Sequence, residues 1–246
     1  MLKKILIIVI FAFLVSACSS NKSLISLPSE VKWQRAESFY NASKYSKAIP
    51  YYQQLIFEKN SIYTADAQYK LGECYFKTKK YIDAVFEYQE LLRLFPDHRL
   101  APDAQFQIAM SFVKLSHSPH YTQDETYKAI DNFTRFIEKY PTDKRVSEAY
   151  QNIAAMQVKL IEKKYLNGYI YFKMKDYSAS LLYLDDIIAL GNRNELEKKA
   201  LYYSALIYID RKDSESANHT YNQLKQHFSD SREFKRVEKR IKKLNK

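Results

Sequence analysis

The apolar positions of this chain follow a helical period and recur in five segments of the same design. Each segment has a small anchor residue, an apolar or aromatic residue four positions later, and another apolar residue seven positions later. The anchors are Ala48, Ala84, Ala129, Ser180 and Ala217. Residues at i, i+4 and i+7 lie on one side of an α-helix, so the pattern predicts five amphipathic helices with the same buried face.

A second helical pattern precedes each anchor. Its small residue lies twelve positions before the anchor in four segments and twenty positions before it in the third, and an aromatic residue follows three positions later. The small residues are Ala36, Gly72, Ala109, Gly168 and Ala205. Glycine costs a helix interior ~1 kcal/mol, so Gly72 and Gly168 predict places where the paired helix packs closely.

The combined pattern resembles the tetratricopeptide repeat, a helix-turn-helix unit of about 34 residues. The clearest copy contains Leu71, Gly72, Tyr75, Tyr81, Ala84, Tyr88 and Pro96. The tryptophan position of that family is not filled, although Trp33 lies one residue away from it. The resemblance predicts an all-α fold, a right-handed tetratricopeptide-repeat superhelix (α-α solenoid) of about five helix pairs with a C-terminal capping helix.

Two of the intervals between anchors are longer than this unit. The intervals are 36, 45, 51 and 37 residues. In the third segment the polar sequence SHSPHYTQ predicts a loop between the two helices. Before Gly168 the apolar period continues without proline, which predicts one long helix over about residues 142–175. A helix of that length spans on the order of 50 Å and joins the front repeats to the rear repeats.

The last helical pattern is strongly basic. Phe234, Val237, Ile241 and Leu244 form its apolar side, which is typical of a helix that covers the end of a solenoid. Residues 231–246 contain eight Lys or Arg and two Glu, a large part of the net charge of +11. We interpret the basic side as a solvated outer face and expect no nucleic-acid binding, while contact with anionic lipid head groups is the alternative.

The first 17 residues have the layout of a secretory signal peptide. Two lysines precede an apolar segment that ends in small residues, and this segment is shorter than the roughly 20 residues that span a membrane. Val15-Ser16-Ala17-Cys18 resembles the bacterial lipobox. The resemblance implies that Cys18 becomes the first residue and carries a diacylglycerol and an amide-linked acyl chain such as palmitate, which anchor it stably in a membrane. The alternative is that Cys18 is one apolar residue of a cleaved peptide.

The residues that follow the lipobox predict the target membrane and the connection to the first helix. Ser19 follows Cys18 in place of the Asp that retains such lipoproteins in the inner membrane, so the resemblance implies the outer membrane. We expect residues 18–28 to form a flexible tether.

The sequence contains few elements of catalytic or metal chemistry. Its three glycines form no phosphate-binding loop, and no nucleophile motif of the GxSxG kind occurs. Asp185 and Asp186 are adjacent on a helix and therefore point in different directions. His117 and His120 lack a third ligand at metal-binding spacing, and Cys74 is expected to be a small buried hydrophobe. We therefore expect a binding protein, not an enzyme, with no cofactor and no metal.

The first helices of stacked repeats line the concave side of a superhelix. Their polar and phenolic residues that packing does not use are candidates for a groove that binds an extended peptide through stacking and hydrogen bonds. These candidates are Gln34, Glu37, Tyr40, Gln68, Tyr69, Gln105 and Gln107. The alternative is that the aromatic members belong to the core.

From the lipobox to the basic final helix, the chain resembles the BamD family of outer-membrane assembly lipoproteins. The interrupted third repeat and the overlong helix after it carry this resemblance. It implies repeats 1–3 over residues 29–141, and repeats 4–5 with the capping helix over residues 142–246. It also implies a periplasm-facing scaffold of the β-barrel assembly (BAM) complex.

The family resemblance also implies which partners each half binds. The front repeats would bind C-terminal segments of unfolded outer-membrane proteins, and the rear repeats would bind the periplasmic domains of BamA, beside other BAM lipoproteins. Met174 and Lys175 are candidates for the BamA contact by position alone.

Three other classes of protein share some of these features. A lipidated tetratricopeptide adaptor for cell-wall or envelope enzymes would have the same anchor and repeats. A soluble periplasmic repeat protein would lack the lipid-bearing cysteine, and a lytic enzyme would need a catalytic domain for which no residues remain.

Overall fold

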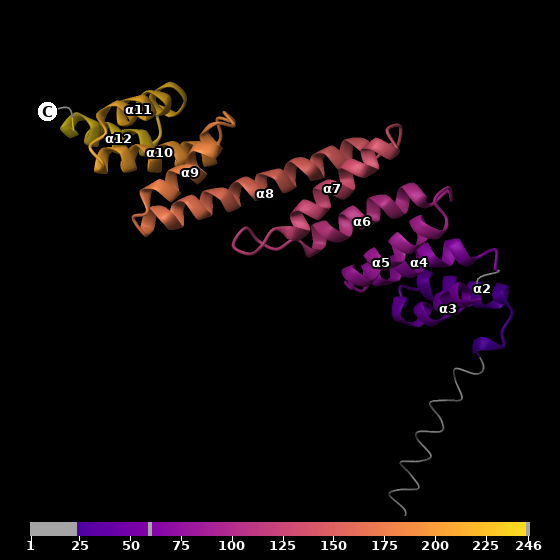
Figure 1. Ribbon diagram of the computed structural model, residues 1–246. Coiled ribbons are helices and arrows are strands. Elements are labelled where there is room, and N and C mark those ends of the chain that lie inside the picture. The colour runs from indigo at the N-terminus through magenta and orange to yellow at the C-terminus, as the bar shows by residue number, and fades with distance from the viewer. Residues whose placement is uncertain (1–23, 59–60, 245–246) are drawn as a thin grey trace, which may run out of the picture. The chain divides into compact units, whose positions relative to one another are not determined.

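The computed structural model describes residues 24–58 and 61–244, and this part of the chain contains helices and no strand (Figure 1). The helices are α2 (Ser29–Asn41), α3 (Tyr45–Phe57), α4 (Thr64–Lys77), α5 (Tyr81–Leu94), α6 (Ala101–Leu115), α7 (Asp124–Lys139), α8 (Val146–Lys173), α9 (Tyr177–Ile188), α10 (Glu195–Asp210), α11 (Ser214–Phe228) and α12 (Arg232–Leu244). Helices α2 to α11 form five consecutive pairs, and α12 follows them. The predicted all-α tetratricopeptide-repeat fold is confirmed, while the signal peptide and Cys18 lie outside the described residues.

The buried face predicted for the second helix of each pair is also confirmed. All five anchors are fully buried, and so are the residues four positions later in the first four pairs. Those four residues are Tyr52, Tyr88, Phe133 and Leu184. In the fifth pair the equivalent Tyr221 is half-buried and stacks on Phe234 of α12, with 5.4 Å between ring centroids.

Gly72 and Gly168 lie where a side chain of the paired second helix occupies the space next to the missing Cβ. A Cβ atom on Gly72 would lie 2.6 Å from Cε1 of Tyr88, and one on Gly168 would lie 2.9 Å from Cδ2 of Leu184. Both neighbours stand four residues after an anchor. The missing side chain of the first helix therefore makes room for a large residue of the second, as the spacing predicts.

Four of the five helix pairs are joined by the same tight turn. Ser43, Lys79, Lys175 and Lys212 have positive φ angles between 56° and 62°. The residue after each one donates a backbone hydrogen bond of 2.8–3.0 Å to the carbonyl five positions back, as in a Schellman motif. None of the four is a glycine, so the sequence gives no conventional signal for these turns.

The third pair has the predicted loop, and the predicted long helix follows it. Residues 116–123 connect α6 to α7, and they are the sequence SHSPHYTQ. Helix α8 has 28 residues, which corresponds to about 42 Å. It begins at Val146 and not near residue 142, because Pro141–Arg145 form a turn in which Val146 N–H donates to the Asp143 carbonyl at 3.1 Å.

The described chain consists of two compact units. The front unit contains the described residues up to Ser116 together with Tyr127–Ile153, and the rear unit contains His117–Thr126 and the residues from Ala154 onward. The division falls inside α8, whereas the sequence placed it at residues 141 and 142. Within the rear unit, Nζ of Lys163 donates to the carbonyl of His120 at 3.4 Å.

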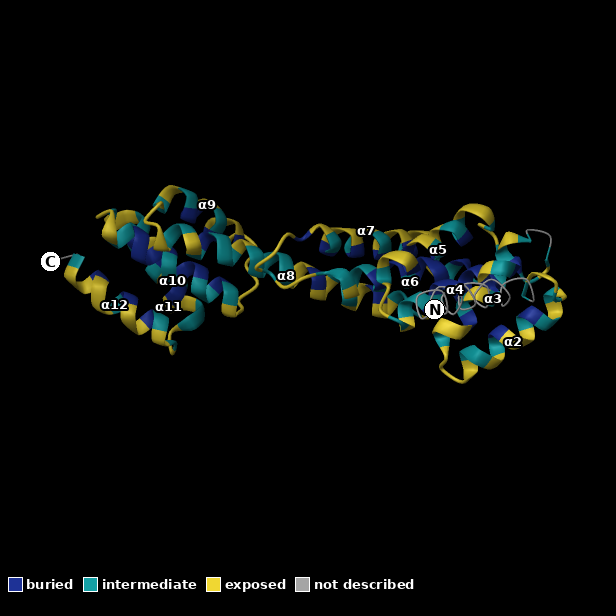
Figure 2. Cartoon of the chain, turned by 90° about the horizontal axis from the view of Figure 1, so that it is seen from below, coloured by how far each residue is buried: buried dark blue, intermediate teal, exposed yellow. Residues whose placement is uncertain are grey.

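The last helix of the rear unit has the predicted apolar side. Phe234, Val237 and Ile241 are buried in a cluster with residues of α10 and α11, and Leu244 packs against its edge. The Lys and Arg side chains that the structure describes on α12 are exposed, as Figure 2 shows for its outer side. The prediction of a capping helix with a solvated basic face is therefore confirmed.

Candidate peptide-binding face of the front unit

The first helices of the front unit, α2, α4 and α6, each have an acid in the first turn and an aromatic residue three positions later. A second acid and aromatic residue follow at the same spacing in α2 and α4, whereas α6 has Met110 and Val113 there. Residues spaced 3, 4 and 3 apart share one side of a helix. We call this set of twelve residues the first-helix face: Glu30, Trp33, Glu37 and Tyr40 on α2, Asp66, Tyr69, Glu73 and Phe76 on α4, and Asp103, Phe106, Met110 and Val113 on α6.

The acid in the first turn of each of these helices binds a residue from the turn before the next first helix. Tyr63 Oη donates to the carboxylate of Glu30, and Arg99 forms an ion pair with Asp66. Arg145 Nη1 lies 2.6 Å from Asp103 Oδ1. These contacts connect each repeat to the next one along the edge of the first-helix face.

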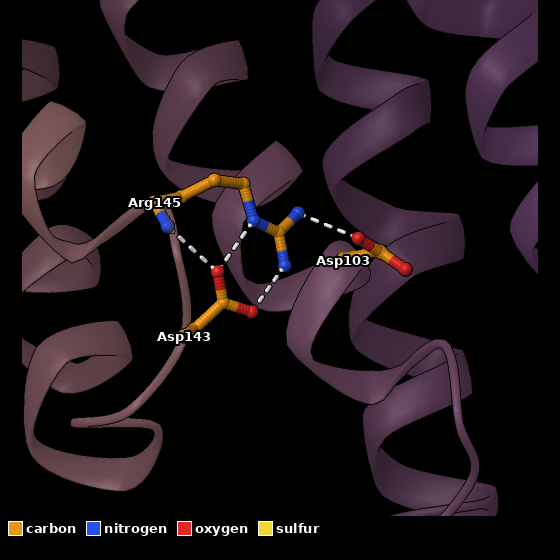
Figure 3. A network of polar contacts seen from close by, with 3 residues as sticks. All are labelled: Asp103, Asp143 and Arg145. Atoms are coloured by element: carbon orange, nitrogen blue, oxygen red, sulfur yellow. Dashed lines mark hydrogen bonds and ion pairs between the residues drawn. The ribbon is translucent and has the colours of Figure 1, made fainter.

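Arg145 forms the most extensive of these connections (Figure 3). Its guanidinium donates to both carboxylate oxygens of Asp143, at 2.9 and 2.7 Å, as well as to Asp103. It also lies 5.0 Å from the ring centroid of Phe106 and 5.3 Å from that of Phe136. The hydrogen bonds from Arg145 hold the pKa of Asp143 below its usual range, so the pair remains charged near neutral pH.

The second acidic position of α2 and α4 is occupied by Glu37 and Glu73. Tyr52 Oη donates to Glu37 at 2.6 Å. Lys70 Nζ donates to Glu73 at 2.8 Å and lies 4.0 Å from the ring centroid of Tyr40. Burial, and then the neighbouring carboxylates, raise the pKa of Tyr40 and of Tyr52, so both phenols remain protonated hydrogen-bond donors.

Solvent reaches four of the seven predicted peptide contacts. Gln34 is exposed and donates to Glu30 at 2.6 Å, while Glu37 and Tyr40 are half-buried on the first-helix face. Gln107 is also half-buried. Peptide binding by these residues stays a prediction.

The other three predicted contacts are buried, so the expectation that packing does not use them is wrong. Gln68, Tyr69 and Gln105 are at most 9% exposed. The amide of Gln68 donates to the backbone carbonyl of Glu87 at 3.3 Å and also to its carboxylate. The ring of Tyr69 lies 5.5 Å from that of Tyr88. These side chains contact the second helix of their own repeat.

Gln105 makes the same kind of contact as Gln68. Its Nε2 donates to the backbone carbonyl of Asn132 at 3.3 Å and to Oδ1 of the same residue at 3.2 Å. Each glutamine stands four residues before the small residue of its helix. Four residues are about one helical turn, so the glutamine and the small residue face the same partner helix. The amides therefore satisfy polar groups inside a helix pair.

Lys32 and Lys164 occupy the same position as these glutamines, four residues before the small residue. Lys32 is 1% exposed, pairs with Glu58 and donates to the carbonyl of Ile25 at 3.0 Å. Lys164 lies 2.6 Å from Asp186 of α9. The polar residue at this spacing is buried in the first three repeats and exposed at Lys164, so the spacing is a signal in the sequence for a structural position in the front unit.

The remaining candidate chemistry is sparse in the part of the chain that the structure describes. Cys74 is fully buried, and burial raises the pKa of its thiol to about 12. No group of three His, Cys, Asp or Glu side chains there has an arrangement that holds a metal ion. Nor does any helix among residues 24–58 and 61–244 combine the length and apolar character needed to cross a membrane.

The chain matches the model of one protein family. The family model described as "YfiO: Outer membrane lipoprotein" matches residues 28–224. No curated protein sequence matches the chain.

Solved structures of repeat proteins are similar to the chain at low sequence identity. A tetratricopeptide repeat protein from Bacteroides fragilis is 12% identical with a TM-score of 0.47, and the match covers 89% of this chain and 100% of that one. YrrB, a tetratricopeptide repeat protein with an unusual peptide-binding site, is 15% identical with a TM-score of 0.35, over 92% and 97%. The second such domain of human RPAP3, in complex with an HSP70 peptide, is 17% identical with a TM-score of 0.40, over 51% and 92%.

Proposed function

Because the chain belongs to the YfiO family of BamD-like outer membrane lipoproteins, we propose that it is a lipid-anchored, periplasm-facing scaffold of the outer-membrane β-barrel assembly complex. It binds C-terminal segments of unfolded outer-membrane proteins and the periplasmic domains of BamA, beside other lipoproteins of the complex. It acts by binding and not as an enzyme. The family match over residues 28–224 carries this proposal.

The first-helix face supports the peptide-binding part of the proposal. Each of its five carboxylates is already paired with a cation or a phenol within the front unit. Cations neutralise three of them, while Glu30 and Glu37 accept hydrogen bonds from neutral phenols and keep their negative charge. The face thus offers carboxylate oxygens beside the half-buried rings of Trp33, Tyr40 and Phe76. Such a surface suits an extended segment with exposed backbone N–H groups and aromatic side chains.

Exposed apolar residues of the rear unit support the contact with BamA. Ile170 and Met174 at the end of α8 are 52% and 69% exposed, and Leu182 on α9 is 68% exposed. Lys175 lies beside Met174, in the turn between these helices. Large exposed apolar side chains on consecutive helices and the turn between them favour a protein partner. Met174 and Lys175 are thus proposed to lie in the docking surface.

The lipid anchor is the third part of the proposal. Cys18 is proposed to carry the acyl chains, and residues 18–28 to connect them to α2. The described end of this segment contacts the first repeat, because the carbonyl of Ile25 accepts a hydrogen bond from Lys32. The anchor would hold the repeats at the periplasmic side of the outer membrane, where unfolded β-barrel proteins arrive.

A peptide-binding measurement tests the role of the first-helix face. The probe is a fluorescent peptide with the sequence of the last strand of an outer-membrane β-barrel protein, measured by anisotropy against the full chain in detergent. Tyr40→Ala should weaken binding by about fivefold to tenfold, the usual effect of removing an aromatic anchor. Gln89→Ala, an exposed change on the second helix α5, should leave it unchanged. Equal affinities of both variants and the unmodified protein would refute this role.

A further inference from the structure

The rear unit contains a pocket of about 420 Å³ that the proposed function does not use. Its volume lies within the range of about 300–1,000 Å³ that is usual for ligand sites. Three helices contribute to it. The lining residues are Phe172 of α8, Tyr202, Leu206 and Asp210 of α10, and Arg236, Lys239 and Arg240 of α12.

One side of this rear pocket is apolar and held in place by aromatic packing. The ring of Phe172 lies 4.8 Å from that of Tyr203, and the ring of Tyr202 lies 5.0 Å from Tyr203 on another side. Leu206, which also lines the pocket, is 8% exposed. Because these side chains already pack on one another, a ligand would find the apolar floor formed and would not have to order it.

The other side of the pocket has an excess of positive charge. Asp210 is the one acid of its lining, and its carboxylate already has two partners. Arg240 Nη1 lies 3.5 Å from Asp210 Oδ1, and Tyr177 Oη donates to Asp210 Oδ2 at 3.1 Å. Arg236 and Lys239 are exposed and form no ion pair with any residue that the structure describes. Two cationic side chains of the lining, Arg236 and Lys239, are therefore available to bind an anion.

We propose that the rear pocket binds an acidic segment of a protein partner in which an Asp or Glu stands next to an aromatic or aliphatic residue. The carboxylate binds between Arg236 and Lys239, and the neighbouring apolar side chain rests on Phe172 and Tyr202. A guanidinium at one wall suits a carboxylate, because it donates two parallel hydrogen bonds. This pocket and the first-helix face consist of different residues in different units, so an experiment can refute one of the two binding proposals without affecting the other.

The residues that line the pocket favour a peptide over a membrane surface as its ligand. A flat anionic surface would contact the whole exposed side of α12, including Lys235 and Lys243, which do not line the pocket. Nor would it use the apolar floor. These differences make the two cases separable by experiment.

The experiment uses the full chain in detergent and three fluorescent peptides of equal length with Gly-Ser flanks. Their central residues are Glu-Phe-Glu, Gln-Phe-Gln and Glu-Gly-Glu. Binding is followed by anisotropy at about 0.15 M salt, where charges more than about 8 Å apart are screened. Glu-Phe-Glu should bind most tightly. Arg236→Glu with Lys239→Glu should weaken its binding by about tenfold or more, because a charge pair is replaced by repulsion.

Lys235→Glu with Lys243→Glu is the matched control. It makes the same change in net charge on the same helix, at exposed residues outside the pocket, and should weaken binding less than about twofold. Tyr202→Leu keeps an apolar residue and should reduce the preference for Glu-Phe-Glu over Glu-Gly-Glu. Circular dichroism should show that each variant remains folded, and Arg236→Gln with Lys239→Gln replaces the charge reversal if that variant unfolds.

Three results would overturn the proposal. The first is equal binding of Glu-Phe-Glu and Gln-Phe-Gln. The second is an equal loss of binding in the two double variants. The third is tight binding to phosphatidylglycerol vesicles that both double variants weaken alike, together with no binding of Glu-Phe-Glu, since that would make the basic side of α12 a lipid-binding surface.

Discussion

Replacing Gly72 by alanine tests the packing register on which the repeats depend. The new Cβ would lie 2.6, 2.8 and 3.0 Å from three ring atoms of Tyr88, inside the 3.4–4 Å of ordinary contact. Tyr88 is fully buried, and its ring is rigid. To remove this steric overlap, the ring of Tyr88 or the whole of α5 has to move away from α4.

The expected size of the effect follows from two opposing contributions. Overpacking a core costs about 1–3 kcal/mol. Alanine is more favourable than glycine in a helix interior by ~1 kcal/mol, which offsets part of this cost. Gly72→Ala should thus destabilise the front unit by about 1 kcal/mol, which lowers its melting temperature by about 3–6 °C for a unit of this size.

Gly168→Ala in the rear unit is the matched comparison. Its new Cβ would lie 2.9 Å from Cδ2 and 3.1 Å from Cγ of the fully buried Leu184, and 3.3 Å from Cβ of Tyr183. Because the one contact below 3.0 Å is to the end of a side chain, a smaller shift is required than at Gly72. The gain in helix propensity should then compensate for the contact, and stability should change by less than about 0.5 kcal/mol. Urea unfolding followed by circular dichroism measures both variants. A Gly72→Ala protein as stable as the unmodified one, or more stable, would refute the proposed packing.

Three further predictions concern single side chains. Burial raises the pKa of Glu87 to about 7 from 4.5, so between these values the folded state binds a proton that the unfolded state has lost. Stability should therefore fall as pH rises from about 4.5 to about 7, and Glu87→Gln should flatten this part of the profile. Arg145→Lys loses the paired hydrogen bonds to Asp143 and the contacts with two rings, and should cost about 1–2 kcal/mol in urea unfolding. Cys18→Ala should move the protein from the membrane fraction to the soluble fraction.

Each of these predictions has its own control. A pH profile of Glu87→Gln that still falls between about 4.5 and 7 would assign the titration to another group. Arg135→Lys, at an exposed ion pair with Asp131, should cost less than about 0.5 kcal/mol, and an equal cost for both arginines would contradict the role of Arg145. Cys18→Ala protein that stays with the membranes after a carbonate wash would contradict lipidation at that residue.

The helices and their pairing follow from the sequence because the signals are local and repeated. Small residues and their aromatic partners recur at fixed spacing, so the close approach of Gly72 to Tyr88 is predictable from the helical period. The loop after α6 is equally clear, since its eight residues are mostly polar, include Pro119 and interrupt that period. The lipobox is a local signal as well, although it lies outside the described residues.

The turns and the polar contacts are harder to predict. The tight turns place Ser43 and Lys79 at positive φ without the glycine that usually marks such a position. Gln68 and Gln105 are polar and stand at the border of the apolar side, so composition alone assigns them to solvent. The contact between Asp103 and Arg145 joins residues 42 positions apart, and no local pattern predicts it.

Affinity purification of the full chain from detergent-solubilised envelopes tests the proposed function most directly. The account predicts that the β-barrel subunit of the outer-membrane assembly machinery co-purifies with it, and that less of this subunit is recovered when Met174 is replaced by a charged residue. Recovery of cell-wall hydrolases with no β-barrel subunit would contradict the account and favour a lipidated adaptor for envelope enzymes.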